Sequence, residues 1–420
     1  MANQKPAAEQ SFFKRLFRTD AFTIFQAIVW SLLICALLVV FFDKRVEETM
    51  GYLFARPSDF FSAAWDAFSS FFIALVRGAF FDWEATSFAR MLYPLTESLV
   101  FATPLILSGL AVTVAFQAGL FNIGVQGQII LGGIFATIVG VNLHLPVGLA
   151  VLVAMLAALL GGALWGAIPG ILKARLGANE VIVTIMLNTI ALLLVSRMLQ
   201  LPILIGKGLP SKSANINENA WYPHLLGTGF RLNLGFLVAL VAAYLVWWLL
   251  SRSTFGFELR AVGANPDAAA TAGMNTRKVT VLTMVISGAL GGLAATAPVL
   301  GTEHFLTGSS QGTYGFDGIT VALLGRSSPL GVVLAALLFG ALNAGGSTMQ
   351  AAADIPIDIV TITQAVIVLL IAASEGRKYF RMKRELKATA KTQDASTKAP
   401  PEPQEATPAT SGMTGQEGTK

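Results

Sequence analysis

Ten apolar runs, most of them as long as a membrane-crossing helix, constrain this chain more than any other feature of its sequence. A helical span needs about 20 largely apolar residues, with a range of roughly 17–25. Only 13% of the 420 residues are charged, against about 25% in soluble globular proteins. We therefore predict an all-α polytopic membrane protein with about ten transmembrane helices. The predicted spans are 21–42, 97–118, 124–143, 147–171, 180–199, 233–250, 279–300, 313–326, 329–347 and 358–374.

The first apolar run is predicted to be a retained helix rather than a cleaved signal. It covers 22 residues, whereas the apolar part of a secretory signal has about 7–15. The later segment 59–81 is also apolar, but Asp59, Asp66 and Arg77 interrupt it. Charges at such intervals favour an amphipathic helix lying on the outer membrane surface over a helix that crosses.

The distribution of basic residues predicts which loops face the cytoplasm. Segment 252–278 holds four Lys or Arg and segment 377–387 holds six, whereas the short loops 143–146, 302–311 and 349–357 hold none. Because basic residues are concentrated on the cytoplasmic side of membrane proteins, we expect both termini and 252–278 to be cytoplasmic. Run 313–326 is short enough to re-enter the membrane instead of crossing it.

Composition divides the chain into four predicted parts. The end of the chain is rich in Thr, Ala, Pro, Gln, Glu, Lys and Gly without apolar periodicity, which is typical of disorder. The parts are a cytoplasmic N-terminal segment at 1–20, a first span with an outer amphipathic helix at 21–90, a transmembrane domain at 91–376, and a basic, then disordered, cytoplasmic tail at 377–420.

The predicted topology suggests two inverted groups of four helices, formed by spans two to five and seven to ten. In each group the second helix is irregular: one opens on glycine-containing segment 121–128, and the other is the short segment 315–320. Broken helices at matching places in two halves indicate a transport pathway, because unwound backbone is tolerated only where it lines a cavity or is buried in protein.

Five polar residues at membrane depth are the candidates for lining this pathway. Unpaired polar groups are costly in hydrocarbon, so they bond to backbone, to one another or to a ligand. The alternative for the amides is that they satisfy the broken backbone, and for the aspartate that it caps a short helix. The candidates are Asn122, Gln126, Gln128, Asn188 and Asp317.

Segment 252–278 contains a short predicted helix that suits a soluble partner. Asn265 and Pro266 begin a turn that leads into a helix, because proline is tolerated at the first helical position. Asp267 complements the helix dipole in the first turn, and Gly273 is suited to end the helix. We interpret the helix as a coupling element that fits a groove on an ATPase. An ordinary amphipathic connector is the alternative.

The sequence argues against an enzyme. It contains no Gly-x-x-x-x-Gly-Lys-[Ser/Thr] loop, the motif that cradles nucleotide phosphates, and no plausible catalytic triad. The histidines His144, His224 and His304 are isolated in predicted outer loops, so no metal site is expected. The glycines Gly162, Gly166 and Gly170 are spaced for close helix packing.

Five stretches of this sequence resemble the permease subunits of bacterial ABC importers, in the branch that also serves ribose-type sugars and branched-chain amino acids. The resemblance covers roughly 90–375 and is closest to the nucleoside-uptake group, whose receptor is a basic-membrane-protein type lipoprotein. In two places the chain departs from the pattern: Gln126 stands where glutamate is expected, and Asp267 replaces the glutamate of the Glu-Ala-Ala…Gly docking motif. The matching stretches are 103–110, 119–124, 179–188, 259–273 and 315–325.

The resemblance implies an inner-membrane permease that moves a nucleoside by alternating access. It implies three partners: a second permease, expected to be a paralogue, a cytoplasmic ATP-binding cassette ATPase and an extracytoplasmic substrate-binding lipoprotein. The chain would bind lipid but no nucleic acid and no cofactor, with ATP held by partner subunits. A simple-sugar permease and an ATP-independent secondary transporter are the alternatives. The implied ATPase-coupling residues are Arg260, Asn265, Pro266, Asp267, Ala268, Ala269 and Gly273.

Overall fold

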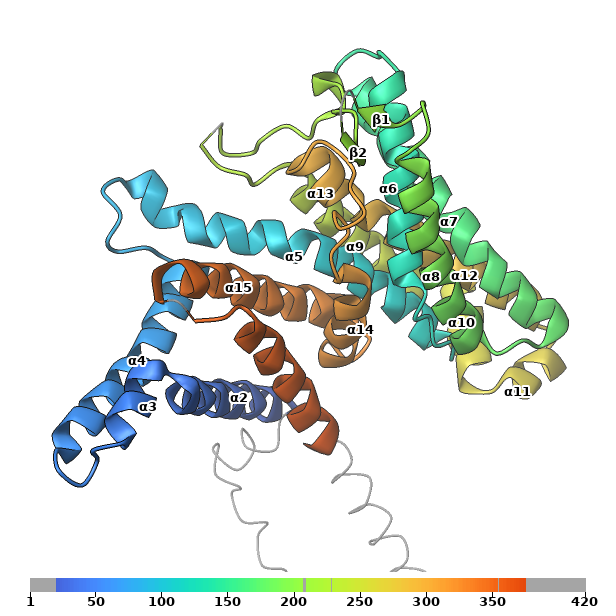
Figure 1. Ribbon diagram of the computed structural model, residues 1–420. Helices are drawn as coiled ribbons and strands as arrows, with labels where there is room; N and C mark the ends of the chain where they lie inside the picture. Colours follow the sequence, from blue (N-terminus) through green and yellow to red (C-terminus); the bar gives the residue numbers. More distant parts are fainter. Residues whose placement is uncertain (1–19, 207–208, 228, 354, 375–420) are drawn as a thin grey trace, which may run out of the picture. The chain divides into compact units, whose positions relative to one another are not determined.

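Long helices make up most of the described chain in the computed structural model (Figure 1). The structure describes residues 20–374 apart from 207–208, 228 and 354, so the predicted tail at 377–420 and most of segment 1–20 lie outside the described residues. The longer helices are α2 (Asp20–Phe42), α4 (Pro57–Ala79), α5 (Phe88–Gln117), α6 (Val125–Asn142), α7 (Leu149–Leu176), α8 (Glu180–Met198), α9 (Leu234–Arg252), α12 (Thr276–Ala294) and α15 (Pro329–Ala353).

Nine helical segments of the described chain are long and apolar enough to cross a membrane. They confirm eight of the ten predicted spans, with α12 extended to Gly301 by the short helix α13 (Thr296–Gly301). The other two predicted spans correspond to shorter apolar helices, α14 (Tyr314–Leu324) and Asp358–Ser374. The fold is therefore the expected all-α polytopic one.

Helix α4 is a further candidate span that the sequence analysis did not include. We predicted an amphipathic surface helix at 59–81, but the 23 residues of α4 also meet the length and composition of a membrane-crossing helix. Its two faces do differ: Phe71 and Leu75 are buried, whereas Trp65 is exposed. A Cβ at Gly78 would overlap Thr348 of α15, so the buried face packs closely on a long apolar helix. The spacing of charges alone therefore does not decide between a helix on the membrane surface and a helix that crosses the membrane.

The most extensive helix contact joins α7 to α12. Added Cβ atoms at Gly162 and Gly166 would overlap backbone oxygens of Gly288 and Met284 on α12, and one at Gly292 would overlap the backbone of α7. Glycine allows two helix backbones to approach this closely, as in other membrane helix pairs. The predicted packing role of the glycine series is confirmed.

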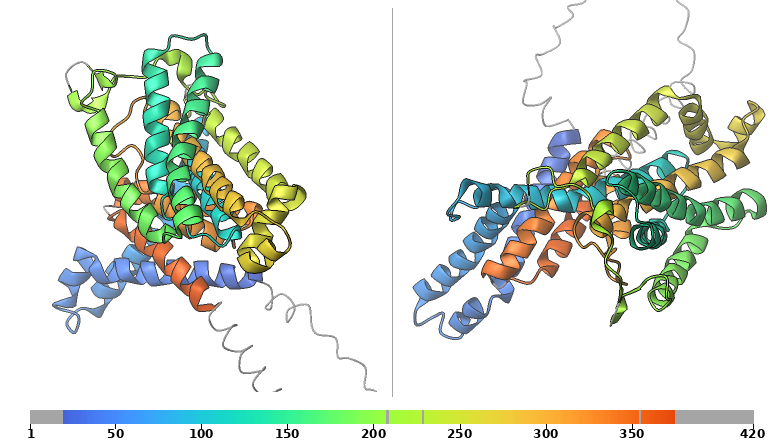
Figure 2. Two further views of the ribbon diagram at one scale, coloured as in Figure 1. Left: turned by 90° about the vertical axis from the view of Figure 1, so that its right-hand side faces the viewer. Right: turned by 90° about the horizontal axis from the view of Figure 1, so that it is seen from above.

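The two predicted four-helix groups interleave. Helix α5, from the first group, packs against α12, α14 and α15 of the second, and α12 also packs against α6 and α7. Figure 2 shows α5 crossing the molecule among these helices. Since the groups share their closest contacts, they are not two separate bodies, and their inverted symmetry stays a prediction.

The structure places the two breaks at or before the starts of the predicted segments rather than throughout them: residues 125–128 and 315–320 are helical. Segment 118–124 is not helical and precedes α6, and segment 302–313 is not helical and precedes α14. Between α8 and α9 the chain forms two short antiparallel strands, β1 (Ile205–Gly206) and β2 (Leu209–Ser213), and the 3-10 helix η1 (Glu218–Ala220). The sequence analysis treated this stretch as a loop.

Candidate functional site

The predicted coupling segment forms two short helices in sequence, α10 (Thr254–Ala264) and α11 (Pro266–Thr271). Asn265 lies between them, and its side-chain oxygen accepts hydrogen bonds from the backbone N–H groups of Asp267 and Ala268, both at 3.0 Å. This is an N-cap that satisfies two otherwise unpaired donors at the start of α11. The predicted turn, helix start and position of Pro266 at the first turn are confirmed.

Six of the seven predicted coupling residues are exposed, and Ala269 is the buried one. Gly273 has φ +85° and would meet no atom within 4 Å if it carried a Cβ. Its backbone therefore needs glycine, while the space beside it is open. Segment 265–273 is held in one shape by its own backbone and cap, and it presents its side chains outward.

A glycine pair connects this segment to the first broken helix. A Cβ at Gly263 of α10 would overlap the backbone at Gln117 and Ala118, and Gly119 lies against Gly263 with φ +70°. The two backbones therefore touch without intervening side chains. Because Gly119 lies in the non-helical segment 118–124 that leads into α6, α10 is in direct contact with the broken helix.

Asn122 and Gln128 lie in a buried amide network. The Asn122 side-chain nitrogen donates to Ser287 Oγ at 2.8 Å and to Gln128 Oε1 at 3.2 Å, and Asn122 Oδ1 accepts from the Gly124 N–H at 3.0 Å. Ser287 Oγ in turn donates to the Ala111 carbonyl at 2.6 Å. The network joins α5, α6 and α12 at the break.

Gln126 connects the two broken helices. Its side-chain nitrogen donates to the Gly312 carbonyl and its oxygen accepts from the Gly315 N–H, each at 2.8 Å. Asn188 of α8 accepts from the Gly127 N–H at 2.9 Å and donates to the Ile123 carbonyl at 3.0 Å. The starts of α6 and α14 thus meet, and side-chain amides occupy backbone donors at both.

Asp317 does not join this amide network in the structure. Its Oδ2 accepts from Thr313 Oγ1 at 2.8 Å in the first turn of α14. The N-cap position of α14 is Thr313, and the Asp317 carboxylate accepts from the hydroxyl of this residue rather than from a backbone N–H group, so the carboxylate is not the helix cap that the alternative describes. Glu180 likewise has a structural partner, because its carboxylate lies 2.8 Å from Lys173 Nζ. Among the described residues no three His, Cys, Asp or Glu side chains are placed to hold a metal ion.

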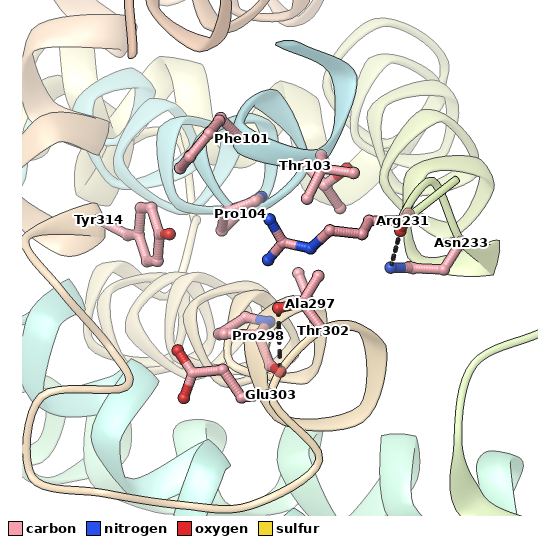
Figure 3. Close-up of a pocket in the computed structure, with 11 residues that line it drawn as sticks. Phe101, Thr103, Pro104, Arg231, Asn233, Ala297, Pro298, Thr302, Glu303 and Tyr314 are labelled. Carbon is pink, nitrogen blue, oxygen red and sulfur yellow. Dashed lines mark hydrogen bonds between the residues drawn. The ribbon is translucent and has the colours of Figure 1, made fainter. Parts of the chain in front are cut away.

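A polar cavity lies at the start of α14, where Tyr314 lines it, between α5, α13 and the loops at 231–233 and 302–303 (Figure 3). Its volume is about 140 Å³. Phe101, Pro104 and Pro298 give it apolar walls, and Figure 3 shows the Arg231 guanidinium extending between these walls toward Tyr314. Glu303 lies on another side of the same cavity.

Ionisable groups around the cavity interact with one another. Arg231 donates to Glu97 Oε2 at 2.9 Å, and the Glu97 side chain is only 11% exposed. Burial raises the pKa of Glu303, against the lowering effects of a hydrogen bond with Ser310 and of the Arg231 charge. The sequence analysis singled out none of these three. Glu97, an ionisable residue at the start of an apolar run, carried the signal that could have found them.

The described residues thus define a membrane transport subunit, in which two broken helices meet, a polar cavity lies at the start of one of them, and α10, which leads into the capped helix α11, contacts the other. The chain belongs to the family "Branched-chain amino acid transport system / permease component", which matches residues 95–374. Members of this family are permease subunits rather than enzymes, and the chain is a multi-pass protein of the cytoplasmic membrane.

Several curated proteins are similar over most of the chain. The Guanosine ABC transporter permease protein NupP of Bacillus subtilis is 43% identical over 294 residues, which are 69% of this chain and 83% of NupP. The Glucose ABC transporter permease protein TsgB13 of Haloferax volcanii is 38% identical, covering 69% and 79%. The Nucleoside ABC transporter permease protein NupB of Lactococcus lactis is 36% identical, covering 66% and 78%. No solved structure matches the chain.

Proposed function

We propose that this chain is the permease subunit of an ATP-driven importer that moves a nucleoside across the cytoplasmic membrane. The family match and the relatives named for guanosine and nucleoside transport carry the proposal. They leave the ATP-independent alternative without support. The solutes named for the three relatives, guanosine, glucose and nucleosides, are neutral and carry a hydroxylated sugar ring.

The proposed partner at α11 is a cytoplasmic ATP-binding cassette ATPase. Asp267 is exposed on α11, and the Asn265 cap fixes the backbone around it without using its carboxylate. A preformed helix with a free charge loses little conformational freedom when it docks. The Asp267 carboxylate would pair with a basic residue of the ATPase groove. Charged contacts of this kind fix how two proteins align at an interface and which partner is bound.

The proposed transmission route runs through the backbone contact between Gly263 and Gly119. When the ATPases close, α10 and α11 would move together and displace segment 118–124. The amide network at Asn122 and the bridge at Gln126 would pass this displacement to the starts of α6 and α14. Alternating access would then arise from local movement of the broken helices, since the two four-helix groups interleave.

The proposed assembly contains a second permease and an extracytoplasmic lipoprotein that binds the solute. The named relatives come in pairs: Bacillus subtilis has a second match, NupQ, at 28% identity, and Lactococcus lactis has NupC at 27%. This pattern supports a paralogue as the second permease. Solute affinity would reside mainly in the lipoprotein, while the permease supplies a weak polar route.

Co-purification and transport test the proposal together. A tagged chain solubilised from its native membrane is expected to bring down an ATPase and a second permease. Vesicles containing this complex and the lipoprotein are expected to accumulate guanosine when ATP is enclosed with the ATPases. A chain that purifies without an ATPase, or vesicles that accumulate guanosine equally without ATP, would contradict the proposed function.

A further inference from the structure

The cavity beside the broken helices combines a fixed cation with a facing acceptor. Arg231 is held by its hydrogen bond to Glu97, and the Arg231 side chain remains 49% exposed. A guanidinium carries five N–H donors, and its bonds to Glu97 and Tyr93 leave donors for a ligand. The buried Glu97 Oε1 has no hydrogen-bond partner among the described residues. A polar acceptor beside Arg231 is therefore still unsatisfied.

Glu303 supplies the acceptor. It lines the same cavity as Arg231, and the two interact electrostatically without an ion pair in the part of the chain that the structure describes. Asn233 and Thr302 add polar side chains to the same walls. A ligand in this space would meet a donor on one side and a carboxyl group on another, while Phe101 and Pro104 contact its apolar parts (Figure 3).

The size of the cavity restricts what it can hold. Its volume of about 140 Å³ is below the roughly 300–1,000 Å³ of pockets that enclose a whole small-molecule ligand. It therefore suits one part of a nucleoside, such as the pentose, rather than the complete solute. Adjacent hydroxyl groups match its chemistry, because each hydroxyl both donates and accepts a hydrogen bond.

Charge argues against an anionic ligand. Glu97 already balances Arg231, so an added phosphate would face the Glu303 carboxyl group without an unshared cation. The starts of the two broken helices do not replace that cation, because Gly124, Gly127 and Gly315 donate their N–H groups to Asn122, Asn188 and Gln126. Side-chain amide oxygens therefore accept from the backbone N–H groups with which a helix start would otherwise bind an anion.

We propose that the cavity between Arg231 and Glu303 binds the vicinal hydroxyl groups of a neutral, pentose-bearing solute as it passes through the permease. Glu303 accepts from the hydroxyl groups and Arg231 donates to them. Glu97 is a positioning residue that holds the guanidinium. This inference rests on the proposed function and assigns the sugar-recognising groups to residues outside the predicted pathway set.

The test compares uptake of guanosine and 2′-deoxyguanosine by the complete complex in vesicles. The ratio of the two initial rates is measured for the wild type and for Glu303→Gln with the same lipoprotein, so that lipoprotein preference cancels. A hydrogen bond to a charged acceptor is stronger than one to a neutral amide, so Glu303→Gln is expected to reduce the preference for guanosine by about tenfold. Glu48→Gln, the same change at an exposed site on α3 (Lys44–Met50), is expected to leave the ratio unchanged.

A second variant keeps the test independent of assembly defects at Glu303. Arg231→Lys retains a cation beside Glu97 but loses the planar fork, and it is also expected to lower the guanosine preference. Wild-type ratios in both variants, with normal guanosine uptake, would overturn the inference and leave the proposed function intact. Absence of ATP-dependent guanosine uptake by the wild-type complex would instead refute the proposed function.

Discussion

The coupling segment 265–273 and the buried amide network at 122–128 are both polar parts of an apolar chain, but their bonds are arranged in opposite ways. In the coupling segment the polar bonds are local, and the side chains of Asp267 and Ala268 remain exposed. In the network Asn122 is fully buried and bonded to three different groups. Local capping with free side chains indicates a surface made for a partner. Long-range bonding with no exposure indicates groups that hold the helices together.

The largest expected effect lies in the buried network. Asn122→Leu removes the partner of the Gly124 N–H, Gln128 and Ser287, and buried groups left unpaired cost about 1–3 kcal/mol each. Since these groups find some replacement partners, we expect the free energy of unfolding to fall by about 2–3 kcal/mol. Thermal unfolding of the purified complex in detergent measures this loss.

Asn215→Leu provides the matched control for that experiment. Asn215 is exposed, so the same substitution there is expected to change stability by less than about 0.5 kcal/mol. Equal unfolding midpoints for the two variants would show that the network around Asn122 is not structural.

A substitution in the coupling segment is expected to have the opposite effect: ATPase stimulation is lost, while the free energy of unfolding is unchanged. Asp267→Lys reverses a charge whose side chain takes no part in the Asn265 cap. We expect solute-stimulated ATP hydrolysis to fall by about tenfold or more, because like charges at an interface cost several kcal/mol. ATPase assays of the reconstituted complex measure it. Asp267→Glu keeps the charge and is expected to retain stimulation; full stimulation in the lysine variant would remove Asp267 from the coupling role.

The contact between the two regions is expected to show an intermediate effect. Gly263→Ala places a methyl group against the backbone at Gln117 and Ala118, and such overpacking costs about 1–3 kcal/mol. The expected result is a severalfold drop in solute moved per ATP hydrolysed, measured as the ratio of uptake to phosphate release. Gly229→Ala, where a Cβ meets nothing within 4 Å, is the control. An unchanged ratio at Gly263 would place the transmission route elsewhere.

The smallest effect is expected at Asp317. Its side chain accepts a hydrogen bond from Thr313, and Asp317→Asn keeps an acceptor at that position. We therefore expect solute uptake to change by less than about twofold, because the hydrogen bond from the Thr313 hydroxyl is kept and one such bond contributes only about 1 kcal/mol. Initial rates of uptake measure it, and a large loss would return Asp317 to the predicted pathway.

Much of this contrast was predictable from the sequence, because it depends on local rules. Apolar runs fixed the existence of most long helices, and the order of Asn265, Pro266, Asp267 and Gly273 predicted a short capped helix that the structure contains. The breaks before α6 and α14 followed from glycines in apolar surroundings. In each case the deciding residues are neighbours in the chain.

The rest depends on residues that are distant in sequence. Asn188 and Gly127 are 61 residues apart, and Gln126 and Gly315 are 189 apart, so no local pattern shows that their polar groups are paired. Arg231 and Glu303 line one cavity, and Arg231 also donates a hydrogen bond to Glu97, 134 residues away in the sequence. Packing also decides the surroundings of α4, because charge spacing alone does not show which face meets α15.

Cross-linking from the coupling segment tests the central claim most directly. A photoreactive residue would replace exposed Ala268 in one version of the chain and exposed Asn215 in another, within a complex that still imports guanosine. Illumination is expected to join the chain to the ATPase from position 268 and to give no such product from position 215. An active complex that yields no ATPase adduct from position 268 would contradict the assignment of this segment as the place where ATP hydrolysis drives the permease.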